Sequence, residues 1–145
     1  MQRIMIIMGT RPEAIKLCPL VLELKRRKKH EVLVCSTGQH RSMLDSVLRV
    51  FQIKPDFDLD VMRTGQTLSS VTSRILKGLD EILSAEHPNL VIVQGDTTTA
   101  FAGALAAGFL PRGFPLGGSL GGGAVTLEGL GGTARIRHLE PEPIR

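Results

Sequence analysis

The sequence predicts an α/β fold built on a doubly wound parallel sheet. Two continuous apolar runs, RIMIIM at residues 3–8 and NLVIVQ at residues 89–94, are typical of strands buried on both faces of such a sheet. A glycine and then a helical pattern follow each run. Strand and helix patterns alternate over residues 1–107, and this order gives parallel strands with helices on both faces.

The first half of this region is expected to hold two strands and two helices. A helix runs from Pro12, which is tolerated in a first helical turn, to about Lys28. The next buried strand is EVLVCS at residues 31–36, and TGQH at residues 37–40 forms a turn. A second, amphipathic helix follows, because one apolar face is spaced at i, i+3, i+4 and i+7: Leu44, Val47, Leu48 and Phe51.

The second half repeats the pattern. DFDLDVM at residues 56–62 alternates acidic and apolar residues, which predicts a short strand with one wet face. Apolar residues at steps of three and four between Leu68 and Ile82 predict a helix that ends before Pro88. The strand NLVIVQ then leads into a last helix, TTTAFAGALAA at residues 97–107.

The composition changes after Ala107. Residues 108–145 hold ten of the 16 glycines and four of the eight prolines of the chain. Neither a helical nor a strand period continues for long enough there to indicate an element, so we expect loop or disordered chain. A phosphate-binding loop is disfavoured, because the glycines fit no Gly-x-Gly-x-x-Gly pattern and no Lys-Ser/Thr follows them.

Charge and cysteine content exclude several classes of protein. The net charge of +4 owes much to KRRKK at residues 25–29, which falls at a helix end where cations complement the dipole; we favour that interpretation over nucleic-acid binding. The two cysteines, Cys18 and Cys35, form no Cys-x-x-Cys or Cys/His cluster, so we expect reduced thiols and no zinc site. The first apolar run is too short for a signal peptide or a membrane span, which favours a cytoplasmic protein.

The loop after the first strand has the residues of an anion site. Gly9 permits a sharp turn and close approach of a ligand, and Thr10 could cap the helix that begins near Pro12. Free N–H groups at a helix start bind anions, and the guanidinium of Arg11 suits a diphosphate. Lys16 could reach the same anion or be solvated. For Glu13, a role in complementing the helix dipole would be a sufficient explanation.

The loop after the last strand lies at the same edge, because parallel strands place all their carboxyl ends together. Gly95 is permissive there, and Asp96 is either an N-cap or a general acid or base beside the bound anion. Thr97 and the two threonines after it could cap the helix or hold a ligand. His40, in the turn after the second strand, could face the same cleft or be solvated.

Five blocks of the chain resemble the bacterial non-hydrolysing UDP-N-acetylglucosamine 2-epimerases. They follow the family's order and spacing from Met1 to about Ala107: GTRPEAIKLCPLVLEL, TGQHRSMLDSVL, FQIKPDFDLDVM, QTLSSVTSRILKGLDEIL and PNLVIVQGDTTTAFAGALAA. The resemblance implies two Rossmann-like domains arranged as in B-type glycosyltransferases, with the active site between them. Residues 1–107 would be part of the first domain.

The resemblance also implies an activity. The family interconverts UDP-GlcNAc and UDP-ManNAc without a metal or redox cofactor, by anti-elimination of UDP to a 2-acetamidoglucal and re-addition. By position, Gly9, Arg11, Lys16 and Thr97 would bind the substrate and Asp96 would be the acid or base. A second UDP-GlcNAc regulates some members near Gln39 and His40; here Ser42 replaces a glutamine of those members. Family members are usually homodimers, with no nucleic-acid or membrane partner.

The chain departs from the family after the alanine-rich helix. The family's GHVEAGLR and SPxPEE segments, which each supply an active-site carboxylate, are absent, and RGFPLGGSLGGGAVTLEGLGG stands in their place. The expectation is therefore a truncated form that is inactive alone. The alternatives are a non-catalytic nucleotide-sugar binder or remnant, and a flavodoxin-like domain, which the alternation alone would also allow.

We hypothesise a reading-frame shift between about Ala107 and Pro115. Translation of GC-rich coding DNA in the wrong frame would give this change in composition toward Gly, Pro, Arg and Leu. Sequencing the coding DNA is expected to show a His-(Val/Ile)-Glu-Ala-Gly-Leu-Arg segment in another frame. The hypothesis is wrong if no frame encodes it.

Overall fold

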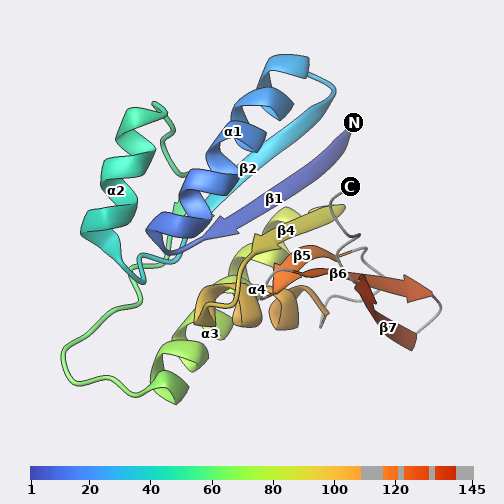
Figure 1. Cartoon of the computed structure of the whole chain (residues 1–145). Coiled ribbons are helices and arrows are strands. Elements are labelled where there is room, and N and C mark those ends of the chain that lie inside the picture. The colour runs from blue at the N-terminus through green and yellow to red at the C-terminus, as the bar shows by residue number, and fades with distance from the viewer. Residues whose placement is uncertain (109–115, 121–122, 131–132, 140–145) are drawn as a thin grey trace, which may run out of the picture.

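The computed structural model describes residues 1–108, 116–120, 123–130 and 133–139. They form one sheet with helices on two faces (Figure 1). The elements in chain order are β1 (Gln2–Met8), α1 (Arg11–Arg27), β2 (His30–Ser36), α2 (Arg41–Val50), β3 (Phe57–Asp58), α3 (Leu68–Glu86), β4 (Leu90–Gln94), α4 (Thr98–Gly108), β5 (Leu116–Leu120), β6 (Gly123–Leu130) and β7 (Thr133–Leu139). The predicted α/β class is confirmed.

The strand order is β3-β2-β1-β4-β5-β6-β7. The strands from β1 to β5 pair in parallel, and the last two pairs, β5 with β6 and β6 with β7, are antiparallel. The order 3-2-1-4-5 is that of nucleotide-binding doubly wound sheets, whereas flavodoxin-like sheets run 2-1-3-4-5. The flavodoxin-like alternative is therefore wrong.

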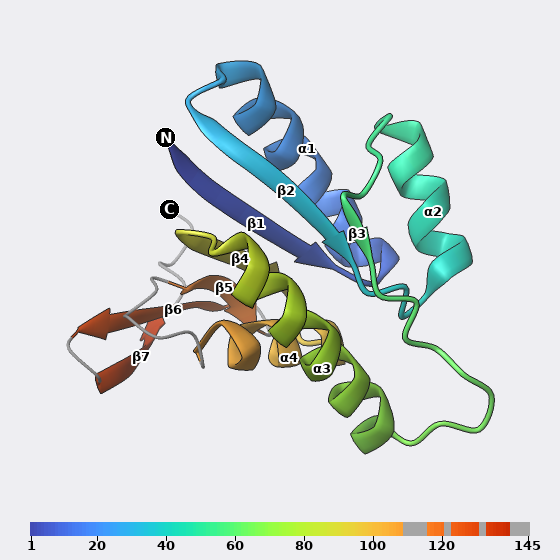
Figure 2. The ribbon, with the colours of Figure 1, turned by 180° about the vertical axis from the view of Figure 1, so that it is seen from behind.

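Both faces of the central strand β1 are buried. Ile4, Ile6 and Met8 pack with apolar residues of α1 and α2. The intervening Met5 and Ile7 pack with α3 and α4 on the opposite face. The two helix pairs lie on opposite sides of the sheet (Figures 1 and 2). The continuous apolar run at residues 3–8 predicts this double burial, because successive side chains of a strand point to opposite faces.

The strand expected at residues 56–62 is much shorter in the structure. Only Phe57 and Asp58 pair with β2, opposite Cys35 and Ser36. Asp60 has a φ of 45°, in the left-handed region that extended strands do not use. Leu59 N and Val61 N still donate to Ser36 O and Thr37 O, but the left-handed backbone at Asp60 keeps the regular strand from continuing past Asp58.

The expectation of irregular chain after Ala107 is wrong for three segments, because β5, β6 and β7 extend the sheet. Strands pair through hydrogen bonds between backbone N–H and C=O groups. β5 can therefore pair with β4 although its side chains show no alternation of apolar and polar residues. Leu120 pairs with Gly123 and Leu130 with Thr133, which leaves two residues between strands in each case. Those residues are Gly-Gly pairs, a hairpin signal that the sequence offered.

The two cysteines are free and fully buried. Burial raises the pKa of Cys18 to about 11. Burial, together with the nearby Asp58 carboxylate, raises the pKa of Cys35 to about 12. Both side chains are therefore thiols at neutral pH and part of the core. None of the helices that the structure describes is long and apolar enough to cross a membrane.

Gly103 lets α4 lie close to the sheet. A Cβ at this position would be 2.8 Å from Val93 Cγ1 and 3.4 Å from Ile7 Cδ1, whereas a Cβ at Gly108 would meet no atom of the described residues within 4 Å. We expect Gly103→Ala to lower the free energy of unfolding by about 1–3 kcal/mol, as overpacking does. Gly108→Ala should change it by less than about 0.5 kcal/mol. Urea unfolding measures both, and equal effects of the two substitutions would contradict this packing.

Candidate active site at the carboxyl ends of β1 and β4

The loops after β1 and β4 lie at the same edge of the sheet, because these strands are parallel neighbours. This is the point where the strand order reverses, and open α/β sheets bind ligands there. The two loops are in direct contact, since the hydroxyl group of Thr97 donates a hydrogen bond to the carboxylate of Glu13. The prediction that the segments carrying Arg11 and Asp96 share one edge is thus confirmed.

Glu13 is the residue whose role the sequence interpretation underestimated. Its side chain is 1% exposed, and its carboxylate accepts hydrogen bonds from the backbone N–H groups of Gly9 at 2.7 Å and Thr10 at 2.9 Å. The spacing Thr10-x-x-Glu13 is that of a capping box, in which the glutamate reaches back to the N-cap backbone. That spacing was the signal that could have identified Glu13 as more than a dipole-complementing residue.

The space beside Gly9 is filled by two hydroxyl groups. A Cβ there would lie 2.1 Å from Thr37 Oγ1 and 2.3 Å from Thr99 Oγ1. These two buried hydroxyls are 2.9 Å apart and hydrogen-bonded to each other. Glycine is therefore required at this position for the contact between β1, the end of β2 and α4. Gly95 is required for another reason, since its φ is +91°.

Gln39 joins the third loop to the start of α4. Its side-chain oxygen accepts hydrogen bonds from Thr99 N at 3.2 Å and from Thr99 Oγ1 at 2.7 Å. The backbone N–H of His40 donates to Gly9 O at 2.9 Å, while the imidazole is exposed. The predicted regulatory pair is thus divided, with Gln39 bound to the candidate site and the ring of His40 in solvent.

Thr97, rather than Asp96, caps α4. The hydroxyl oxygen of Thr97 accepts from Ala100 N at 3.1 Å, and its carbonyl accepts from Phe101 N at 3.0 Å. Asp96 is exposed, and its carboxylate has no hydrogen bond to the residues that the structure describes. The alternative that Asp96 is an N-cap is therefore wrong, and its carboxylate is accessible from solvent.

Side chains already occupy several of the amide groups that were expected to bind an anion. Glu13 accepts hydrogen bonds from the N–H groups of Gly9 and Thr10. Gln39 accepts from the N–H of Thr99, and Thr97 accepts from the N–H of Ala100. Two helix starts therefore have fewer free donors than the sequence suggests. A bound diphosphate would depend mainly on cationic side chains.

Arg11 and Lys16 supply such cations from different sides of α1. Lys16 Nζ lies 3.2 Å from the amide oxygen of Gln94, in the amide orientation in which that oxygen also accepts from Gly95 N at 3.3 Å. Lys16 therefore reaches the end of β4, next to the loop that carries Asp96. Arg11 instead lines a cavity of about 310 Å³ between α1 and α2, with Ile15, Ser46, Val47, Val50 and Phe51.

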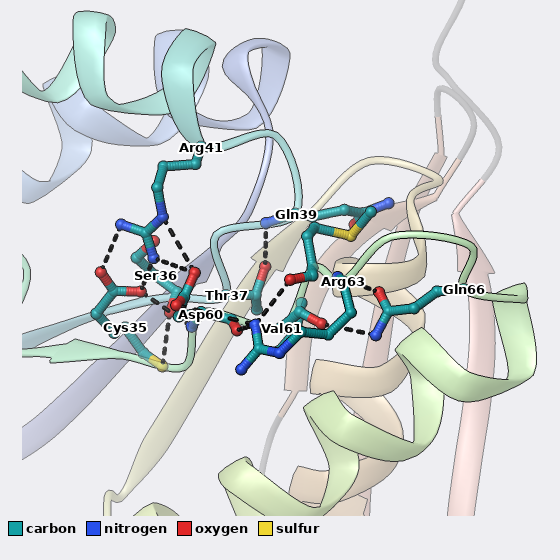
Figure 3. A network of polar contacts seen from close by, with 11 residues as sticks. Cys35, Ser36, Thr37, Gln39, Arg41, Asp60, Val61, Arg63 and Gln66 are labelled. Carbon is teal, nitrogen blue, oxygen red and sulfur yellow. Dashed lines mark hydrogen bonds and ion pairs between the residues drawn. The ribbon is translucent and has the colours of Figure 1, made fainter.

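An ion-pair network holds the neighbouring segment (Figure 3). The guanidinium of Arg41, at the start of α2, donates two hydrogen bonds of 2.8 Å to Asp58 and two, of 3.0 and 3.2 Å, to Asp60. This contact lowers the pKa of Asp58 and raises that of Arg41. The network ties α2 to the loop after β3, and so fixes the backbone that carries Gln39. No group of three or more His, Cys, Asp or Glu side chains that could hold a metal ion occurs in the described part of the chain.

Comparison with known proteins shows the family of the chain. The family model for UDP-N-acetylglucosamine 2-epimerase matches residues 22–112. The UDP-N-acetylglucosamine 2-epimerase of Bacillus subtilis is 55% identical over 105 residues, which are 72% of this chain and 28% of the relative. The chain therefore spans little more than a quarter of that relative's length.

Solved structures give the same match. A Staphylococcus aureus MnaA–UDP co-structure superposes with a TM-score of 0.75 at 50% identity, over 81% of this chain and 30% of that one. The UDP-GlcNAc 2-epimerase of Neisseria meningitidis bound to UDP-GlcNAc gives a TM-score of 0.73 at 44% identity, over 81% and 31% of the two chains. The fold, with its switch point between β1 and β4, is that of a doubly wound α/β protein. More specifically, the chain belongs to the UDP-N-acetylglucosamine 2-epimerase family.

The Arg41 network gives a pH-dependent expectation. Because the folded-state pKa of Asp58 lies below its usual 3.8, the stabilisation is present above that pH and is lost as the pH falls through the lowered value. Arg41→Gln should therefore lower the free energy of unfolding by about 0.5–1 kcal/mol at pH 7, and by less near pH 3. Urea unfolding at both pH values measures the difference.

Arg74→Gln is the matched control, because Arg74 is an exposed arginine on α3 with no ion pair to the described residues. It should change stability little at either pH. A difference between wild type and Arg41→Gln that is constant from pH 7 to pH 3 would contradict the assignment.

Proposed function

We propose that this chain is a truncated form of an enzyme that interconverts UDP-GlcNAc and UDP-ManNAc, and that it is inactive alone. The observation that carries the proposal is that the switch point presents an exposed carboxylate, Asp96, in the loop after β4, and that Lys16 reaches Gln94 at the end of the same strand. Family membership supports it, as do the related structures from S. aureus and N. meningitidis, which contain UDP and UDP-GlcNAc.

The proposed roles follow from the chemistry of elimination. Removing the proton at C2 of the sugar needs a base, and the C2–H electron pair forms the C1–C2 double bond as the C1–O bond to UDP breaks. Asp96 is our candidate for the acid or base, since its carboxylate is exposed at the strand end. Lys16 and Arg11 would stabilise the negative charge of the departing diphosphate. Return of a proton to the opposite face of C2, with re-addition of UDP at C1, completes the epimerisation.

Gly9 and Thr97 contribute as parts of the loops rather than through free polar groups. The hydroxyl of Thr97 already bonds Glu13 and Ala100 N, and the space beside Gly9 is filled. Their predicted role in substrate binding therefore becomes the shaping of the two loops. For Gln39 and His40 a regulatory role stays a prediction, as do a homodimer and a cytoplasmic location.

The isolated chain supplies only one side of the proposed cleft. We propose that residues 1–107 are part of the first of two Rossmann-like domains, and that residues 108–145 are not part of its site. Proton transfer and departure of UDP need groups on both sides of the sugar, and misplacing them removes most of the rate gain. Because the chain supplies groups on one side of the sugar only, we favour a non-catalytic nucleotide-sugar binder as the alternative for this chain.

A test of this proposal uses UDP and UDP-GlcNAc with the 145-residue chain. We expect UDP to bind and to raise the unfolding temperature, because a ligand that binds only the folded state stabilises it. Lys16→Gln should weaken UDP binding by about tenfold, the loss of a charge-assisted hydrogen bond of ~1.4 kcal/mol. Calorimetric titration measures the affinity, and chromatography after incubation with UDP-GlcNAc should detect no UDP-ManNAc.

Lys77→Gln is the control, since Lys77 is an exposed lysine on α3, away from the strand ends. It should leave UDP affinity unchanged. Absence of UDP binding would refute the binding role of this chain, and measurable UDP-ManNAc would refute its expected inactivity.

A further inference from the structure

The proposed reaction gives no role to Glu13, although its carboxylate lies buried beneath the candidate site. Its two oxygens serve different loops. Oε2 accepts from the N–H groups of Gly9 and Thr10 in the loop after β1, at 2.7 and 2.9 Å. Oε1 accepts from the hydroxyl of Thr97 in the loop after β4. One side chain thus connects the two segments that carry Lys16 and Asp96.

A carboxylate suits this position because all three of its partners donate. An ionised carboxylate accepts at both oxygens, whereas a glutamine side chain accepts at one and presents N–H groups at the other. The Glu13 carboxylate is buried without a cationic partner among the described residues. The three hydrogen bonds and its place in the first turn of α1 offset the free-energy cost of burying this charge. A neutral amide of the same shape, with its oxygen on Gly9 N and Thr10 N, could only donate to the Thr97 hydroxyl, so it would replace a charge-assisted contact with a weaker neutral one.

The contact between Glu13 and Thr97 affects the position of the candidate acid or base, Asp96. Thr97 caps α4 and follows Asp96 in the chain, so its hydroxyl fixes where the helix begins and where the backbone of Asp96 lies. Gln39 holds Thr99 independently of Glu13. The helix therefore keeps one attachment when the contact between Glu13 and Thr97 is removed, and the folded state remains open to measurement.

We propose that Glu13 is a positioning residue that holds the loops after β1 and β4 at a fixed separation, so that Lys16 and Asp96 face one nucleotide sugar. This inference rests on the proposed function for the identity of that ligand. The link between the loops is a property of the chain itself. Preorganisation of this kind affects ligand binding because polar groups act only within a narrow range of positions.

The test compares four variants of the 145-residue chain by calorimetric titration with UDP and by NMR-detected hydrogen exchange of backbone amides. Glu13→Gln weakens the contact between the loops by removing its charge, Thr97→Val removes the contact together with the N-cap of α4, and Thr97→Ser keeps the hydroxyl. Glu23→Gln is the matched control, because Glu23 is on the same helix but bonds only Arg26 and Arg27 at the surface. Urea unfolding shows that each variant is folded under the conditions of the titration.

We expect Glu13→Gln and Thr97→Val to weaken UDP binding by at least fivefold and to speed exchange of the amides at residues 95–98. Thr97→Ser should restore both properties to near the wild-type values, and Glu23→Gln should alter neither. A purely structural role would lower stability in the Thr97→Val chain without changing the UDP affinity of the folded protein. Unchanged exchange at residues 95–98 in Glu13→Gln would overturn the proposal, because Thr97→Val also removes the N-cap of α4.

The outcomes separate this inference from the proposed function. If the wild-type chain binds no UDP, the binding role of the chain is wrong, and amide exchange still decides whether Glu13 holds the second loop. If wild type binds UDP and Glu13→Gln and Thr97→Val bind it equally well, the proposed function stands and the positioning role is wrong.

Discussion

The parallel pairing of β1 with β4 is the constraint on which the rest of the molecule depends. It places β1 between β2 and β4, so that both faces of β1 are covered by helices and its side chains divide between two apolar clusters. It also reverses the strand order at this point, which opens the carboxyl edge between the two crossovers. The loops that bear the charged groups meet there as a consequence of topology.

Three loops are then bound together by polar groups with little exposure. The hydroxyls of Thr37 and Thr99 meet beside Gly9, Gln39 reaches the start of α4, and Glu13 joins the loops after β1 and β4. Most of these groups satisfy backbone donors that a helix start leaves unpaired. The same contacts that cap the helices therefore determine the shape of the candidate site, while the charged groups of Lys16 and Asp96 remain available for a ligand.

Apolar periodicity predicted most of the fold because apolar side chains are the ones that folding buries. The uninterrupted run at residues 3–8 indicated a strand with two buried faces, and α2 and α3 lie where their apolar spacing placed them. The pattern failed where backbone geometry decides: Asp60 in a left-handed conformation ends β3 early, and β5 forms from a glycine-rich segment by pairing with β4. Side-chain period carries no signal for either event.

The sequence by itself determined the fold class, the edge that carries the candidate site and the family, since these follow from element order and from motifs read in register. The tertiary structure decided which groups at that edge are free. Glu13 and Asp96 are both acidic residues near a helix start, yet one is buried in three hydrogen bonds and the other is exposed. The capping-box spacing accounts for the two bonds of Glu13 to Gly9 and Thr10, but its bond to Thr97 depends on the parallel pairing of β1 with β4, because Thr97 lies 84 residues further along the chain.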